Sequence, residues 1–458
     1  MARVEQGPQG PLLFLLTGFL LVFAPLILGG NRPLPLLVLE LAGVAGLAVL
    51  AWQGQARLLV EPLPMTLKLG IALLVAVPLL QLVPLPAGWW SLLPGHAPYA
   101  ASLPFAGEEA VQAMRPLSIH PRATQYSWLV ILPCLAVFLL ALSVPRHKVR
   151  KLVGLFVIVA VCEALLGIMQ LGAGPGSPLF FGNTHGGGVS TGTYVNRNHF
   201  AALMAMAVPS ALVLWYLETR MARNGSGEAL LPHPRHRDRW RAMQVALALP
   251  VLFILVALVF SMSRGGIGAG FLAFALASLA LVPRAQTRWA KITYGAIGAG
   301  AIAFSAYIGL TPVLDRFGSE NLSLGFQGRG AIAAATARGA VDFLPFGSGL
   351  GTFADVFRRY QGEGMPGFVD FAHNDYAQLF LELGVAGVAV IFLALAAYLS
   401  RWVQLARVWR ERSLGHLQLA AGLGMLAMLV HGLVDFNFHI PANALYFSFL
   451  AGVFFHRE

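Results

Sequence analysis

Charged and polar side chains stand where apolar stretches of the sequence begin or end. Arg197, followed by Asn198, opens one such stretch, and Arg264 lies in the short connection between two others. A charge held at membrane depth is costly and marks a candidate functional site. Because the planar guanidinium fork suits diphosphate oxygens, these arginines indicate phosphate recognition. The ordinary alternatives are a surface ion pair or an arginine that reaches out to the membrane interface.

His373 stands where a long loop leads into another apolar stretch, with Asn374 next to it. Histidine is the usual general base near neutral pH, which predicts a proton-transfer role for His373. The ordinary alternative is a histidine whose hydrogen bonds are purely structural. Glu382, further along the same stretch, is interpreted as a structural hydrogen-bond partner.

A further polar group lies in the segment 431–443. His431, Asp435 and His439 are spaced by four residues, so on one helix they would share a face and resemble a metal site. Pro441 limits any helix there, and a hydrogen-bonded turn that supports the catalytic face is the favoured interpretation. The sequence contains no D-x-D or HExxH metal motif and no phosphate-binding glycine loop, so neither a metal nor a cofactor is expected.

The composition indicates what holds these side chains. The chain has 458 residues, of which 57% are hydrophobic and only 11% carry a charge. Soluble domains carry about 25% charged residues, so the composition excludes a soluble enzyme of this size. A bilayer is the environment in which so apolar a chain is stable. Both of the 2 cysteines lie in apolar runs, which leaves no disulfide framework.

Windows of about 20 apolar residues, the length that crosses the hydrocarbon core, predict an all-α polytopic membrane protein with about twelve spans. The expected spans lie near residues 11–29, 34–52, 66–85, 126–144, 151–172, 198–217, 242–261, 265–282, 291–310, 375–399, 415–434 and 440–455. The first nine fall within residues 1–310, and the last three fall within 375–458. Between them, residues 311–374 are predicted to form a periplasmic loop with two short helices, near 330–343 and 350–360.

The distribution of positive charge predicts the orientation of the chain. Lysine and arginine gather in alternate loops, and positively charged loops stay in the cytoplasm, so both termini are expected there. The basic residues left on the other side are all arginines. Most of the basic residues behind the net charge of +11 therefore serve to orient the chain in the membrane, and nucleic-acid binding is not expected.

The polar segments resemble those of a known family. Residues 373–387, HNDYAQLFLELGVAG, fit the pattern H-[NSQ]-x9-G-x2-[GTY] of bacterial O-antigen ligases. The blocks VNRNHFA at 195–201, SRGG at 263–266 and HGLVDFNFHIPANA at 431–444 resemble the wider O-antigen ligase and polymerase superfamily. The resemblance covers roughly residues 150–455, and the first four spans match in hydropathy alone.

The resemblance implies a GT-C-type glycosyltransferase at the periplasmic face of the bacterial inner membrane, acting in lipopolysaccharide biosynthesis without metal or cofactor. The implied donor is a polysaccharide on undecaprenyl diphosphate, and the implied acceptor is a sugar hydroxyl of the lipid A-core. Both substrates would arrive among the membrane lipids, and the transfer would invert the anomeric carbon.

Matching positions carry the implied roles. His373 is the expected base or acceptor-orienting residue, and the expected diphosphate ligands are Arg197, Arg264 and Arg329. The residues expected to support them are Asn198, Asn374 and Asp435.

Three alternatives stay open at this stage. A polymerase of the same superfamily would join repeat units that are both undecaprenyl-linked, and a protein O-oligosaccharyltransferase would use a protein acceptor. From a different class, about twelve spans also suit a secondary transporter, whose polar residues usually lie near the membrane midplane. Here the polar residues gather at one face, which favours a glycosyltransferase.

Overall fold

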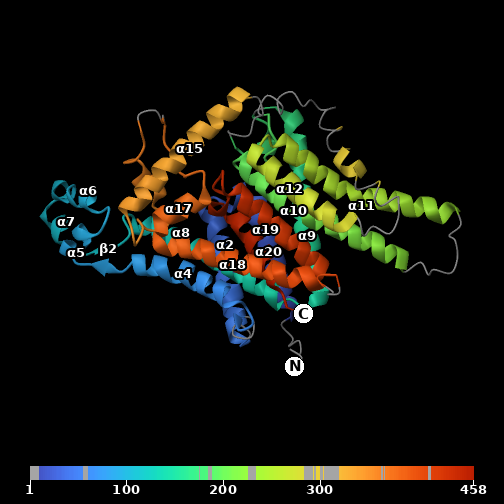
Figure 1. Cartoon of the computed structure of the whole chain (residues 1–458), viewed down its shortest axis with the longest axis horizontal. Helices are drawn as coiled ribbons and strands as arrows, with labels where there is room; N and C mark the ends of the chain where they lie inside the picture. Colours follow the sequence, from blue (N-terminus) through green and yellow to red (C-terminus); the bar gives the residue numbers. More distant parts are fainter. Residues whose placement is uncertain are drawn as a thin grey trace.

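Most of the chain folds into long α-helices (Figure 1). The computed structural model describes residues 10–54, 60–174, 176–183, 188–224, 234–282, 292, 295–299, 303, 319–362, 365, 367–410 and 414–457. Within these residues the strands are limited to β1 (Pro84–Leu85) and β2 (Arg115–Pro116), which pair antiparallel. The all-α class expected from the sequence is confirmed.

Six helices of the described residues are long and apolar enough to cross a membrane. They are α2 (Pro33–Trp52), α8 (Pro121–Ser143), α9 (Arg146–Ala173), α10 (Arg197–Asn224), α12 (Arg264–Leu281) and α18 (Val385–Val408). Shorter apolar segments are α1 (Gly10–Leu26), α4 (Met65–Gln81), α19 (Gly415–His431), α20 (Pro441–Phe455) and the second half of α11 (Pro234–Phe260). The chain is thus a polytopic helical membrane protein. The ninth predicted span, 291–310, lies almost entirely outside the described residues.

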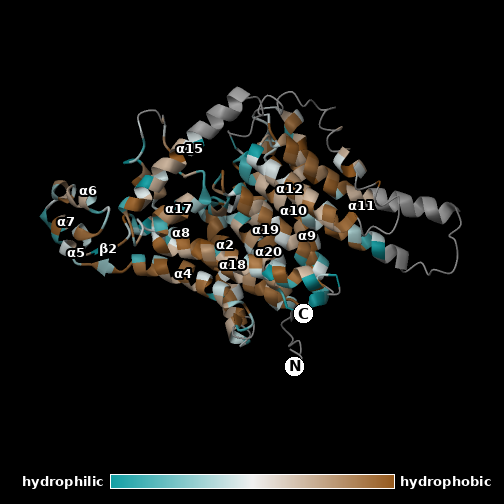
Figure 2. Ribbon diagram, in the orientation of Figure 1, coloured by the Kyte–Doolittle hydropathy of each residue, from teal (hydrophilic) through white to brown (hydrophobic). Residues whose placement is uncertain are grey.

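Helix α10 lies at the centre of the bundle, where it packs against α11, α12 and α19. Every residue from 200 to 213 is buried. A Cβ on Gly266 would lie 2.4 Å from the Cβ of Ala201, so glycine is required where α12 meets α10. The start of α12, with Arg264, is therefore held tightly against the start of α10. Figure 2 shows hydrophobic residues along the bundle helices, as a bilayer environment requires.

The expected tenth span, 375–399, is wrong as a single continuous helix. The chain instead forms α17 (Asp375–Leu383) and α18, which are separated at Gly384. Gly384 has a φ of 58°, and a Cβ there would lie 2.2 Å from the carbonyl oxygen of Pro345. Both the left-handed backbone and this close contact require glycine. Hydropathy shows no interruption because apolar residues continue on both sides of the break.

Glu382 fixes the geometry of this break. Its carboxylate accepts hydrogen bonds from the backbone amides of Gly351 (2.8 Å) and Phe353 (3.3 Å) and from Nε2 of Gln378 (3.0 Å). The structural hydrogen-bonding role expected for Glu382 is confirmed, and the side chain ties α17 to the segment before α16 (Phe353–Phe357).

The segment 311–374 contains two helices in its described residues, α15 and α16. α15 (Ser319–Asp342) is longer than the short helix expected near 330–343. The glycines in its first half, at 325, 328 and 330, lower the helix propensity without ending the helix. α15 packs on α17 (Figure 1).

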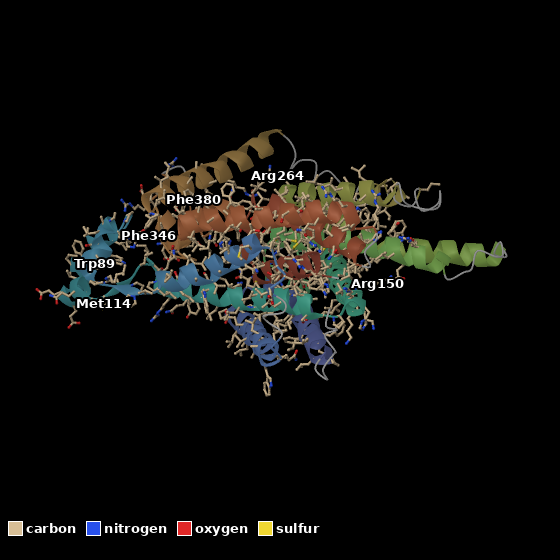
Figure 3. The ribbon with its side chains drawn as sticks, turned by 60° about the horizontal axis from the view of Figure 1, so that its bottom comes forward. Trp89, Met114, Arg150, Arg264, Phe346 and Phe380 are labelled. Carbon is tan, nitrogen blue, oxygen red and sulfur yellow. The ribbon has the colours of Figure 1, made fainter. Side chains whose placement is uncertain are left out.

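A small lobe between α4 and α8 consists of α5 (Ala87–Leu92), α6 (Ala97–Ala100) and α7 (Glu108–Gln112). It projects at the left of Figure 1 and carries the exposed side chains of Trp89 and Met114, labelled in Figure 3. Phe343, near the end of α15, holds the lobe, because a Cβ on Gly95 would lie 2.6 Å from its ring. The lobe and α15 therefore support each other.

Candidate active site

Several helix ends meet at one end of the bundle. α10, α12, α17 and α20 begin there, and α19 ends there. Nδ2 of Asn443 donates to the carbonyl of His199 (3.0 Å), and the Asp375 amide donates to the carbonyl of Gly432 (2.9 Å). The polar residues singled out in the sequence lie at or beside these joined ends.

His373 has an unusual backbone. Its φ is 50°, a left-handed conformation that residues other than glycine rarely adopt. Asn374 holds it in place by capping α17: its Oδ1 accepts from the amides of Tyr376 (3.1 Å) and Ala377 (2.9 Å), while its Nδ2 donates to the carbonyl of Leu433 (2.9 Å). Backbone strain of this kind gathers at functional sites, where the surrounding structure maintains it.

His373, Asp435 and Arg329 lie together although they come from three separate segments. His373 Nδ1 is 3.6 Å from Asp435 Oδ1, and Arg329 Nη2 is 3.6 Å from Asp435 Oδ2. Arg329 also donates from Nη1 to the carbonyl of Val434 (2.8 Å). The Asp435 side chain is 0% exposed, whereas His373 and Arg329 are partly exposed. A buried carboxylate thus stands behind an imidazole and a guanidinium that reach the surface.

The charge of this carboxylate is maintained by its neighbours. Burial raises the pKa of Asp435, but His373 and Arg329, with smaller contributions from His199 and His431, outweigh burial and hold that pKa below its ordinary value. Asp435 is therefore an anion at neutral pH. An anion beside Nδ1 orients the His373 ring and leaves Nε2 as the nitrogen available to a substrate.

Buried polar atoms without a hydrogen-bond partner gather around Asp435. Among the described residues they are Oδ2 of Asp435, Nδ1 of His373, Nε2 of His199, both ring nitrogens of His431, and both amide atoms of Asn437. Most buried polar groups in folded proteins are paired, and exceptions call for a bound water, a ligand or a catalytic role. Such a concentration of unpaired atoms from several segments is a property of a binding or catalytic site.

Phe436 connects the histidines of this site. Its ring centroid lies 5.0 Å from that of His373 and 4.6 Å from that of His199, both in edge-to-face geometry. The ring of Phe371 stacks on it at 4.0 Å. These two phenylalanines fix the position of the His373 imidazole. Sequence reasoning missed both residues, because aromatic residues are common throughout the apolar segments.

Asp375 and His439 form a second acid–imidazole pair. Nδ1 of His439 is 3.0 Å from Oδ1 of Asp375, which also accepts from the amide of Phe438 (3.3 Å). Burial lowers the pKa of His439, but the hydrogen bond and charge of Asp375 outweigh it and raise that pKa above its ordinary value. His439 thus turns to Asp375 while His431 packs against α12, so the spacing of four residues does not bring these histidines together on one face.

Arg264 and Arg197 are the first residues of α12 and α10. Ser263 caps α12, with its Oγ accepting from the amide of Gly266 (3.3 Å). Asn198, a buried residue, donates from its amide to Oδ1 of Asn196 (2.8 Å), which fixes the first turn of α10. Figure 3 shows Arg264 where α12 begins, apart from Arg150 near the start of α9. The two arginines are thus the first residues of two closely packed helices. The starts of both helices lie beside the connection 431–441.

Two buried polar residues of α9 anchor the chain just before Arg197. Gln170 donates from Nε2 to the carbonyl of Gly192 (2.7 Å) and accepts its amide at Oε1 (2.9 Å). Glu163 accepts from the Thr193 hydroxyl (2.8 Å) and amide (2.8 Å). Sequence reasoning missed both residues, although an acidic residue inside an apolar span was an available signal.

The fold and the site together define a polytopic helical membrane protein with a polar, histidine- and arginine-containing site at one end of its bundle. The family model described as O-antigen ligase matches residues 249–392. Over this segment the chain matches the O-antigen ligase family, which confirms the resemblance expected from its motifs. No curated protein matches the chain.

The matched segment contains Arg264, Arg329 and His373, while Arg197 and Asp435 lie outside it. The match supports the O-antigen ligase and polymerase superfamily, which implies glycosyltransferase-like activity on lipid-linked glycans in a membrane. Within the matched segment, Arg264 opens α12, Arg329 lies in α15, and His373 lies two residues before α17.

Proposed function

We propose that the protein is an O-antigen ligase. It transfers a polysaccharide from undecaprenyl diphosphate to a sugar hydroxyl of the lipid A-core, with inversion and without a metal ion. The site end of the bundle faces the periplasm of a bacterial inner membrane, and both termini lie in the cytoplasm. The observation that supports this proposal most directly is the cluster in which His373 and Arg329 share the buried carboxylate of Asp435.

The chemistry follows from which atom of His373 is engaged. Nδ1 faces Asp435, so Nε2 accepts the proton of the acceptor hydroxyl. The hydroxyl oxygen attacks the anomeric carbon of the donor sugar from the side opposite the diphosphate. The bond from that carbon to the diphosphate oxygen breaks, and the lipid diphosphate leaves with the electron pair. The anionic Asp435 stabilises the imidazolium that forms.

The departing diphosphate needs positive charge. Arg264 and Arg197, at the starts of adjacent helices, and Arg329, beside His373, are the proposed ligands. A guanidinium binds two phosphate oxygens at once, and fixed positive groups near the leaving oxygens lower the barrier without rearrangement of solvent. The arginines thereby take the part that a divalent cation plays in other glycosyltransferases.

An acceptor panel tests this function. The purified protein in lipid nanodiscs, supplied with an undecaprenyl-diphosphate glycan, receives lipid A-core, a second lipid-linked repeat unit or an acceptor protein. We expect that only lipid A-core is extended, and that the rate of this transfer is the same with and without EDTA. Extension of the lipid-linked unit would identify a polymerase, glycosylation of the protein would identify a protein ligase, and loss of activity in EDTA would contradict the metal-free mechanism.

A further inference from the structure

His431 is a buried histidine whose position the proposed mechanism has not used. It is the last residue of α19 and is 1% exposed. Its ring lies against the first turn of α12: a Cβ on Gly265 would be 2.8 Å from its Cδ2 and 3.1 Å from its Nε2. A Cβ on Gly266 would be 3.2 Å from its Cε1. The two glycines after Arg264 thus make room for the imidazole.

The same side chain adjoins the catalytic cluster. The backbone amide of Val434, the residue before Asp435, donates to the carbonyl of His431 (3.1 Å), and a Cβ on Gly265 would also lie 2.8 Å from Cγ2 of Val434. His431 therefore contacts the start of α12, which carries Arg264, and belongs to the turn that carries Asp435. A displacement of this ring would change the position of one proposed diphosphate ligand relative to the proposed base.

Packing alone does not account for an imidazole at this position. Among the described residues neither His431 Nδ1 nor His431 Nε2 has a hydrogen-bond partner, and Asp435 Oδ2 also has none. Leaving buried polar atoms unpaired is costly, and a phenyl ring of similar shape would pack against the glycines without that cost. Hydrogen bonds within the turn at 431–443 therefore do not explain why this position carries an imidazole.

We propose that His431 is a positioning residue of the transfer reaction. Arg329 now bonds the carbonyl of Val434 and faces Asp435 Oδ2. When the donor diphosphate draws Arg329 away, the imidazole N–H of His431 donates to Asp435 Oδ2 and keeps the carboxylate ionised behind His373. The ring continues to hold the start of α12, so Arg264 stays in register with the base. This inference rests on the proposed function.

The test compares His431→Phe, which keeps the ring, with His431→Gln, which keeps a hydrogen-bond donor. We expect His431→Phe to lower kcat by about 10- to 100-fold, within the range that a misplaced catalytic geometry costs. The donor KM changes less, and the acid limb of the kcat profile moves to higher pH because Asp435 is protonated more easily. His431→Gln recovers part of the rate and the original acid limb.

Two further variants keep the test decisive. Gly265→Ala displaces the ring without changing its chemistry, so it should lower kcat even if His431→Phe fails to fold. His416→Phe, which replaces a buried histidine at the other end of α19, should keep the wild-type rate and pH profile. The inference would be overturned if His431→Phe kept the wild-type kcat and the wild-type acid limb. It would also be overturned if His431→Phe and His431→Gln had equal effects. If His373→Ala is inactive while His431→Phe transfers glycan at the wild-type rate, this inference alone is rejected. If His373→Ala is active, the proposed function is rejected.

Discussion

Oδ1 of Asp375 lies 3.0 Å from Nδ1 of His439, and two residues before it His373 faces Asp435. Each of the two turns thus supplies one acid and one imidazole to the other. The Asp375–His439 pair is shorter than the His373–Asp435 pair, whose atoms are 3.6 Å apart. The shorter pair therefore fixes the separation of the two turns. We infer that residues 373–375 and 435–439 behave as one unit.

This unit predicts a pH-dependent stability. The pKa of His439 is raised above its ordinary value of about 6.5 because Asp375 outweighs burial. The stabilisation by the pair is therefore fully present below about pH 6.5 and is lost as the pH rises through the raised pKa. We expect the thermal unfolding midpoint of the detergent-purified protein to fall over that interval, and to fall less in Asp375→Asn.

The exposed pair of His120 and Asp355, whose Nδ1 and Oδ2 atoms are 2.6 Å apart, provides the control. Exposed pairs contribute little to stability, so Asp355→Asn should leave the pH dependence unchanged. Parallel unfolding curves for the wild type and Asp375→Asn at every pH would contradict the role given to this pair.

Replacement of Arg264 tests phosphate recognition. Loss of one preorganised charge-stabilising group lowers kcat by about 100- to 1,000-fold, and we expect Arg264→Ala to fall in this range. Arg264→Lys should recover little, because a point charge does not replace the planar fork. Initial transfer rates at saturating acceptor measure both. Arg358→Lys, at a residue stacked on Phe368 at 4.7 Å, is the control and should keep its rate. A wild-type rate in Arg264→Lys would remove Arg264 from the diphosphate site.

The break between α17 and α18 is tested by Gly384→Ala. The substitution forces a side chain into a backbone with φ of 58° and against the carbonyl of Pro345. We expect a destabilisation of about 1–3 kcal/mol, measured as a lower thermal unfolding midpoint. Gly154→Ala, in α9 with open space beside it, should leave the midpoint unchanged or raise it slightly. Equal midpoints for the two variants would mean that the break does not depend on glycine.

Hydropathy predicted most of the helices because a bilayer demands long apolar segments, and the observed α2, Pro33–Trp52, lies close to its expected 34–52. The break at Gly384 was missed because it depends on contact with Pro345, a residue distant in sequence. Hydropathy reports the environment of a segment and carries no information about such contacts.

The site was predictable in its residue types and only partly in its arrangement. Motif resemblance singled out His373 and Asp435, but their proximity arises from the packing of α17 against the end of α19. Arg329 had weaker support from the sequence, since its loop has no distinctive pattern, yet α15 places it on Asp435. The pairing of Asp375 with His439 was not predicted, because the sequence indicated a hydrogen-bonded turn at 431–443 without identifying its partners.

The most direct measurement is glycan transfer to lipid A-core by purified wild-type protein and His373→Ala, followed by mass spectrometry of the acceptor. The account predicts a mass increase equal to the donor glycan with the wild type, and a rate about 100- to 10,000-fold lower in His373→Ala with an unchanged unfolding midpoint. His120→Ala should transfer at the wild-type rate. An unextended acceptor with the wild type, or equal transfer by His373→Ala, would contradict it.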